Sequence, residues 1–365
     1  MARMTGAERI YAAMEGKSTD ILPYVGFFIS PEARMTFLGP AATTASWADA
    51  VLFDTQFFGN DWIQLPIPLP LPSTPGPFSE IFCDDTHCTV ARAPLGAIWF
   101  WRKNPYFTKP VHLPVRTEED LERLEPVDVN RAIPRIKAFQ DHVKRFKDLG
   151  YFLNFDMPGV FESSWMLLRG LEESWIDVVA NPAFYVKIAR KSLKTILDLL
   201  TIAKDILPDV DGVFITDDLG IQESPYFHAS AYREIIMPLH QEMTDYCHSL
   251  GLKVCFHSHG NINNILPDLV EVGFDVIEPF DQRDHMDLAE VRAQYGDTVT
   301  LKGGISYEMG TMSADELKSH LHDVVRKGGS RSFILSTAGG VPPEMSLANL
   351  NLFNREVRRI REDGV

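Results

Sequence analysis

The sequence predicts an α/β protein, a (β/α)₈ barrel that forms one domain over residues 1–365. Short apolar runs recur along the chain, and amphipathic segments of roughly 12 to 30 residues separate several of them, which favours parallel strands joined by helices. Eight such runs are enough to close a barrel. A doubly wound open sheet would show the same alternation, but no G-x-G-x-x-G follows any of the runs, so nothing supports its dinucleotide-binding version.

The eight expected strands cover residues 22–28, 50–58, 151–155, 212–216, 253–257, 274–278, 298–302 and 332–336. Two of the helices between them have clear end signals. Ser230 is expected to cap a helix that stops at Gly251, and Ser313 to cap one that closes at Gly328. A serine side chain satisfies first-turn amides, and glycine accepts the left-handed exit.

A proline-rich segment interrupts the early part of the chain. Residues 61–80 contain six prolines, which excludes a central strand or a helix interior because proline lacks the backbone donor. An aromatic-rich hairpin is expected after it. We therefore interpret residues 60–115 as an insertion that covers part of the barrel.

Composition limits the classes of function. The net charge of −15, from 50 acidic and 35 basic residues, argues against nucleic acid and anionic membranes as partners. No apolar stretch approaches the roughly 18 residues that span a bilayer. The first residues are charged throughout and do not resemble a signal peptide, so we expect a cytoplasmic protein.

The four cysteines are expected to be reduced thiols rather than a disulfide framework. Cys83 and Cys88 form C-x₄-C around His87. A zinc half-site of this kind would need a second pair, which the sequence lacks, so a plain hairpin is the favoured interpretation.

In a barrel of this type, chemistry belongs where strands run into the following loops. His257 and His259, in FHSHGN, lie two residues apart at such a position, so in extended backbone both imidazoles project to one side. Two converging imidazoles are a natural pair of metal ligands. The alternative is that they bond substrate or loop carbonyls. Cys255 points to the same side of the strand but lies two residues further from its end, so we expect it to be packed in the interior. Gly260 allows the chain to turn sharply after the histidines.

Oxygen donors at neighbouring strand ends could complete a metal site. Glu278 is the closest in chain order, with Asp217, Asp218 and Glu162 behind it. Asp217 and Asp218 are adjacent, so at most one is expected to face the cavity, where it could hold a cation or act as a base. Alternatively, these carboxylates cap the following helices or form ion pairs with Arg and Lys around the mouth of the barrel.

Substrate contacts are expected from aromatic rings, from the strand ends and from close backbone approach. The predicted substrate-binding residues are Phe155, Phe161, Gln222, Lys302 and Gly303. Core packing is the alternative for each phenylalanine. The segment LSTAGGVPPE (335–344), which begins with Leu335 and Ser336, could form a cradle of backbone amides for an anion.

These motifs, taken in order, resemble the uroporphyrinogen decarboxylase superfamily. The resemblance rests on GAERIYAAMEGKSTDILPYV, GVFITDDLGIQ, GLKVCFHSHGNINNILPDLVEVGFDVIEP, LKGGIS and FILSTAGGVPPEMSLANL, and it is densest from about 210 to 350. It implies a (β/α)₈ barrel, in agreement with the strand count, and a homodimer.

Two branches of that superfamily differ in their motifs. The decarboxylases bind tetrapyrrole carboxylates through an arginine-rich N-terminal segment, whereas VGFFISPEARMTFLG here holds only Arg34. The corrinoid-dependent methyltransferases hold zinc through His-x-Cys-Gly and a later cysteine. Here His257 matches the histidine, His259 replaces the first cysteine, and Gly339 stands at the second.

The resemblance therefore implies a zinc methyltransferase with harder ligands, suited to polarising an ether oxygen. It would move a methyl group from a small methoxy or methylated compound to a corrinoid, as an O-demethylase does. No D-x-H-x-x-G occurs in the chain, so the corrinoid is expected on a separate partner protein. The alternatives are a metal-free decarboxylase or lyase and a barrel that only binds a ligand.

Overall fold

Eight parallel strands form the central sheet of the computed structural model, which describes residues 3–26, 46–65, 80–103, 107–342 and 344–363. Their order is β1-β12-β11-β10-β9-β8-β7-β2, so that neighbours in the chain are neighbours in the sheet from β7 to β12. The strands are β1 (Tyr24–Val25), β2 (Trp62–Leu65), β7 (Phe152–Pro158), β8 (Gly212–Thr216), β9 (Lys253–His257), β10 (Val276–Glu278), β11 (Thr300–Ile305) and β12 (Phe333–Thr337). This is the predicted (β/α)₈ barrel, nearly closed.

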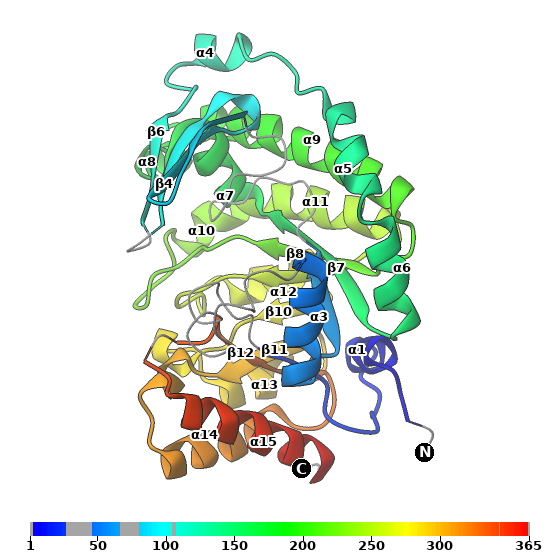
Figure 1. The fold of residues 1–365 in the computed structure, drawn as a ribbon. Helices are drawn as coiled ribbons and strands as arrows, with labels where there is room; N and C mark the ends of the chain where they lie inside the picture. Colours follow the sequence, from blue (N-terminus) through cyan, green and yellow to red (C-terminus); the bar gives the residue numbers. More distant parts are fainter. Residues whose placement is uncertain (1–2, 27–45, 66–79, 104–106, 343, 364–365) are drawn as a thin grey trace.

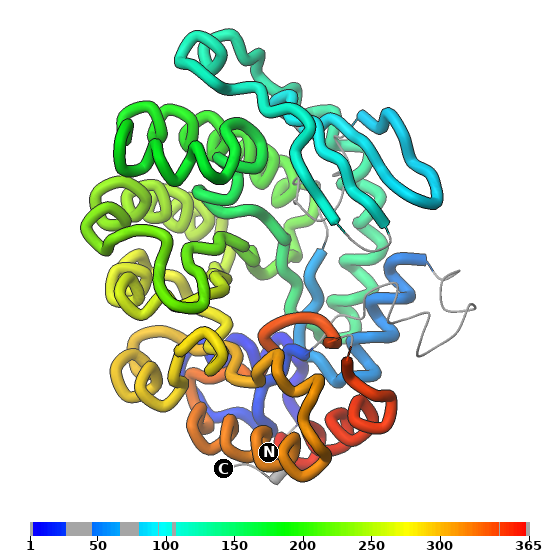
Figure 2. Tube along the Cα trace, turned by 90° about the vertical axis from the view of Figure 1, so that its left-hand side faces the viewer, coloured from blue at the N-terminus to red at the C-terminus, as the bar shows by residue number. Residues whose placement is uncertain are grey.

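Helices surround the sheet, and Figure 2 shows those from α9 to α15 following one another around it in chain order. The described helices are α1 (Gly6–Met14), α3 (Trp47–Phe58), α4 (Glu118–Glu122), α5 (Ile133–Lys137), α6 (Gln140–Asp148), α7 (Val160–Ser164), α8 (Leu171–Ala180), α9 (Pro182–Ile206), α10 (Ala229–Ala231), α11 (Met237–Ser249), α12 (Leu266–Val272), α13 (Leu288–Tyr295), α14 (Ala314–Gly328) and α15 (Leu347–Asp363). The main hydrophobic core lies between these helices and the strands.

A second sheet is built from β3 (Glu80–Asp84), β4 (Cys88–Arg92), β5 (Ile98–Arg102) and β6 (Phe107–His112), all antiparallel. It lies over α7 and α8 at one end of the molecule (Figure 1). Trp99 anchors it there, because its ring packs edge-on against Trp165 and its Nε1–H donates to the Met166 carbonyl at 3.0 Å.

The insertion is confirmed in outline and corrected in two respects. It holds four strands rather than a hairpin. It also begins after Leu65, since Trp62–Leu65 is the second strand of the barrel. The proline-rich residues 66–79 lie outside the described residues.

The expected strand over residues 50–58 is wrong, because this run belongs to α3. Ser46 caps that helix by accepting from the Asp49 N–H, and Gly59 ends it with a φ of 77°. The Ser230 cap is also wrong: the helix begins at Ala229, after His228. Ser313 does cap α14, in a capping box with Glu316, and α14 ends at Gly328 as predicted. In the described residues, no helix is long and apolar enough to cross a bilayer.

Candidate active site

A cavity of about 540 Å³ opens at the carboxyl ends of the barrel strands. All eight strands contribute to its wall, as the rule for such barrels requires. The lining residues are Val25, Gly26, Gln64, Asp156, Glu162, Phe214, Thr216, His257, His259, Glu278, Lys302 and the segment 336–340. Of the residues predicted from strand ends, it therefore gathers His257, His259, Glu278, Lys302 and Ser336, and it adds Asp156 of β7.

Glu278 joins two of these side chains. One carboxylate oxygen bonds His257 Nδ1 at 2.5 Å, and the other accepts from Lys302 Nζ. Burial alone would raise the pKa of Glu278, but the charges of Lys302 and His257 outweigh it and hold the pKa at about 2. Glu278 is therefore ionised, and both of its oxygens are engaged.

Lys302 is buried under two aromatic rings as well as paired with Glu278. Its Nζ lies 4.8 Å from the ring centre of Trp62 and 5.5 Å from that of Phe214. Among the described residues that line the cavity, Lys302 is the only lysine or arginine. Because Lys302 is already paired with Glu278, the described wall offers no further lysine or arginine to bind a carboxylate-rich substrate.

The two histidines lie at right angles, with ring centres 4.7 Å apart. His257 Nε2 is 3.8 Å from Asp218, whose carboxylate also accepts the His259 N–H at 2.8 Å. Burial lowers the pKa of His259, but Asp284 and Asp218 more than offset it, so the pKa is raised. Gly260 turns the chain here with a φ of 90°, close against the backbone of Gly220.

Two carboxyl groups that line the cavity, Asp156 of β7 and Glu162 of α7, each have a buried oxygen without a hydrogen-bond partner. Burial raises the pKa of Asp156 to about 7. Burial, followed by the nearby carboxylates of Asp218 and Asp217, raises the pKa of Glu162 well above its usual value. Asp156 Oδ1, Glu162 Oε2 and His259 Nδ1 are buried atoms without a hydrogen-bond partner, and the carboxylate of Asp284 lies 3.8 Å from His259 Nδ1. Three unsatisfied polar groups around one cavity indicate a site built to receive a polar ligand or a cation.

Asp217 does not face this cavity. It is fully buried and accepts the N–H groups of Phe161 and Glu162, at 3.1 and 2.6 Å, and a bond from His240 Nε2 at 2.7 Å. It thus fixes the start of α7, the helix that carries Glu162. Of the adjacent pair, Asp218 is the one near the histidines.

Four predicted substrate residues lie elsewhere. Phe155 and Phe161 are fully buried in the hydrophobic core, the alternative weighed for them. Gln222 bonds the Arg283 carbonyl on an outer loop at 2.8 Å. Gly303 does allow a close backbone approach, but to Pro279 and Phe280 of the neighbouring strand rather than to a ligand. Arg34 lies outside the described residues.

Three features of the site were not predicted from the sequence: the rings of Trp62 and Phe214, and a buried pair behind Asp217. Trp62 was assigned to the insertion, although the apolar stretch WIQL before the prolines could have revealed its strand. Phe214 lay inside a predicted strand with no sign of its orientation. The buried pair of His240 and Tyr232, joined at 2.9 Å behind Asp217, carried no sequence signal.

As arranged, the predicted metal ligands His257, His259 and Glu278 do not converge. In the described part of the chain, one group of three His, Cys, Asp or Glu residues has its ligand atoms within 4.8 Å of one another, and it is Cys83, Asp85 and Cys88. At the cavity, His259 Nδ1, Glu162 Oε2 and Asp156 Oδ1 have no hydrogen-bond partner, and the nearest carboxylate to His257 Nε2 is that of Asp218, 3.8 Å away.

A (β/α)₈ barrel with an acidic cavity at its carboxyl-terminal face has the architecture of an enzyme. The uroporphyrinogen decarboxylase family model matches residues 102–360, and the chain belongs to that family. The uroporphyrinogen decarboxylases of Nostoc punctiforme and Synechococcus sp. are each 23% identical to it, over 70% and 68% of this chain and 71% of each relative. A methyltransferase from Methanosarcina mazei has the same fold, with a TM-score of 0.72 and 16% identity over 98% of this chain and 99% of that one.

Proposed function

We propose that this protein is a zinc-dependent methyltransferase that moves a methyl group from a small methoxy or methylated compound to a corrinoid held by a separate protein. The observation that carries the proposal is the set of unpaired buried donors, His259 Nδ1, Glu162 Oε2 and Asp156 Oδ1, around His257 at the cavity. Such donors suit a divalent cation. The corrinoid part rests on the family resemblance.

The residues present fit a zinc ion. His257 would bind through Nε2, because Glu278 takes its Nδ1, and a carboxylate on the second ring nitrogen is the usual way in which a protein orients a metal-binding histidine. His259 and an oxygen of Asp218 or Glu162 would complete the set. Glu278 thereby becomes the orienting residue rather than the predicted ligand. When bound, zinc supplies Lewis acidity toward the oxygen that carries the methyl group.

The chain's own acids provide the proton that this reaction consumes. Breaking an ether C–O bond as the methyl leaves produces an alkoxide or phenolate, which must be protonated. Asp156 faces the cavity, and its pKa near 7 leaves it protonated in about half of the molecules at neutral pH. It can donate to the departing oxygen, whichever carboxylate completes the metal site.

The test combines metal content with methyl transfer. Protein purified without chelators or a histidine tag is analysed by mass spectrometry beside His257→Ala/His259→Ala and the control His248→Ala, an exposed histidine at the end of α11. The double variant is expected to lose about one zinc per chain and all methyl transfer to cob(I)alamin. His248→Ala should keep both. Unchanged zinc and turnover in the double variant would refute the proposal.

A metal-free carboxy-lyase is the second candidate, because the same raised pKa values favour it. A protonated Asp156 or Glu162 could deliver a proton to the carbanion that decarboxylation leaves. The cavity wall argues against a polycarboxylate substrate, since Lys302 is already paired with Glu278. Release of CO₂ that persists after treatment with a chelator would favour this candidate over the first.

A further inference from the structure

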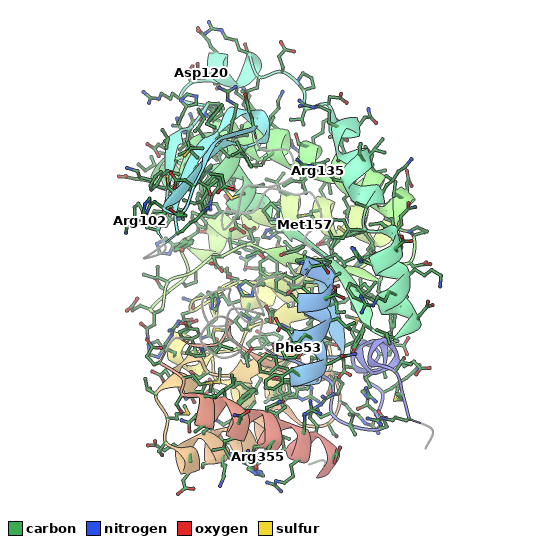
Figure 3. The ribbon with its side chains drawn as sticks, in the orientation of Figure 1. Phe53, Arg102, Asp120, Arg135, Met157 and Arg355 are labelled. Atoms are coloured by element: carbon green, nitrogen blue, oxygen red, sulfur yellow. The ribbon has the colours of Figure 1, made fainter. Side chains whose placement is uncertain are left out.

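The hairpin of β3 and β4 places two thiols on one face of the small sheet. Cys83 lies opposite Val90, and Cys88 is two residues before Val90 on the same strand, so all three side chains project to the same side. The other face, with Thr89 and Trp101, is buried toward the barrel. Both cysteines are half-buried and free. Arg102, which pairs with Cys88, marks this end of the sheet in Figure 3, away from Asp120 of α4.

The turn between the two cysteines is held rigidly by Asp85. One oxygen of its carboxylate accepts the N–H groups of His87 and Cys88, at 2.7 and 2.8 Å. The other lies 3.7 Å from the Cys83 sulfur, within bonding reach of its thiol. Lys103 at the end of β5 secures the same turn, because its ammonium donates to Asp84 and to the Asp85 carbonyl. The carboxylate is thus already directed at the thiols.

The three ligand atoms are close to the spacing that a metal requires. The two sulfurs and one Asp85 oxygen lie within 4.8 Å of one another. In a tetrahedral zinc site with Zn–S bonds of about 2.3 Å, ligand atoms are roughly 3.5 to 3.8 Å apart. A contraction of about 1 Å at most would bring all three onto one ion, and half-buried side chains at a hairpin tip can provide it.

We propose that Cys83, Cys88 and Asp85 bind a thiophilic divalent cation, zinc by preference, with the fourth position taken by water or by His87. The C-x₄-C segment does not need the second cysteine pair that the sequence lacks, because the aspartate in its own turn supplies the third ligand. The effect is to tie β3 to the sheet. β3 is an edge strand of the sheet in the described residues, and four of its five residues are exposed, so it buries little side-chain area. This site is separate from the cavity, whose wall includes none of the three ligands.

The experiment is a titration of reduced, metal-free, full-length protein with Cd²⁺ and Zn²⁺. It is run in the His257→Ala/His259→Ala background so that the cavity does not contribute. Cadmium should produce thiolate charge-transfer absorption, and zinc should be taken from a chromophoric chelator. Cys83→Ser/Cys88→Ser should abolish the absorption and weaken zinc binding on the order of 100-fold. The matched control, Cys247→Ala, changes a buried cysteine of α11 and should bind as before.

A second measurement reports the consequence for β3. Hydrogen exchange over residues 80–84 should slow when zinc is added to protein with both cysteines, and should not change in the double serine variant. Absence of cadmium–thiolate absorption would overturn the proposal, as would equal zinc affinity in the serine variant. Protein that is isolated with a Cys83–Cys88 disulfide and that binds no cadmium after reduction would overturn it too.

Discussion

At the scale of single residues, Glu278 is the group on which the site's electrostatics depend. It is 3% exposed, and it pairs with Lys302, which is 4% exposed. Breaking a buried pair by removing one partner leaves the other charge uncompensated, which costs far more than the pair itself contributes. The arrangement therefore makes a strong prediction about stability.

Glu278→Gln should lower the free energy of unfolding by about 3 kcal/mol, because Lys302 and His257 both lose the charge that they share. Urea denaturation at neutral pH measures the change. The control is Asp198→Asn, which removes an exposed partner of Lys194 on α9 and should change stability by no more than about 0.5 kcal/mol. Equal effects would mean that the buried pair carries no special energetic weight.

Asp156 predicts a pH dependence of stability. Its pKa is about 7 in the folded protein but about 3.9 when unfolded, so between those values the unfolded chain releases a proton that the folded one retains. Stability is therefore lost as the pH rises from about 4 to 7, and does not recover above that. Asp156→Asn removes this loss, so its stability relative to the parent protein should be about 2.5 kcal/mol more favourable at pH 8 than at pH 5. Urea curves at the two pH values that show the same difference would contradict it.

The sequence could predict which strand ends line the cavity, but not which side chains face into it. His257, Glu278 and Lys302 line it, as predicted from their positions at the carboxyl ends of strands. Strand parity failed for Phe155, because both faces of a parallel barrel strand are buried and apolar, so periodicity does not distinguish them. Asp156, its neighbour, takes the cavity side.

At the scale of elements, short apolar runs were the ambiguous case. Residues 50–58 lack a clear period, and such a run fits a buried strand or a helix equally well. The end signals decide between them. Ser46 and Gly59 stand at the spacing of a helical cap and stop, and both have that role in α3. The short strand Trp62–Leu65 was hidden by the proline-rich residues that follow it.

The start of α7 depends on a chain of buried polar groups from Tyr232 through His240 to Asp217. Asp217→Ala should lower the free energy of unfolding by about 3 kcal/mol, because it leaves two helical N–H groups and the His240 imidazole without an acceptor. Tyr232→Phe removes only the hydroxyl at the other end of this chain of hydrogen bonds and should lower it by about 1 kcal/mol. Thermal unfolding of the two variants tests this order. A loss for Tyr232→Phe as large as that for Asp217→Ala would show that the aspartate is not the central member.

At the scale of the whole molecule, β1 and β2 face each other across the seam of the barrel, and their described residues form no strand ladder with each other. Asp61, just before β2, bridges the gap: its N–H donates to the Tyr24 carbonyl at 2.8 Å, and its carboxylate accepts the Tyr24 N–H at 2.9 Å. The same carboxylate binds Arg9 of α1 at 2.8 Å and Arg361 of α15 at 2.6 Å. One side chain thus joins the seam to helices from both ends of the chain.

Asp61→Ala should therefore lower stability by about 3 to 5 kcal/mol, and its effect should be local to the seam. Hydrogen exchange is expected to rise together in β1, α1 and α15, since each loses the same anchor. Asp177→Ala is the matched control, because Asp177 of α8 forms a comparably buried pair with Arg169, away from the seam. That variant should leave β1, α1 and α15 protected. If both substitutions raise hydrogen exchange equally in all elements, the barrel unfolds as one unit and Asp61 does not hold it closed. Loss of protection in β1, α1 and α15 alone, seen only for Asp61→Ala, shows that this one buried carboxylate closes the barrel.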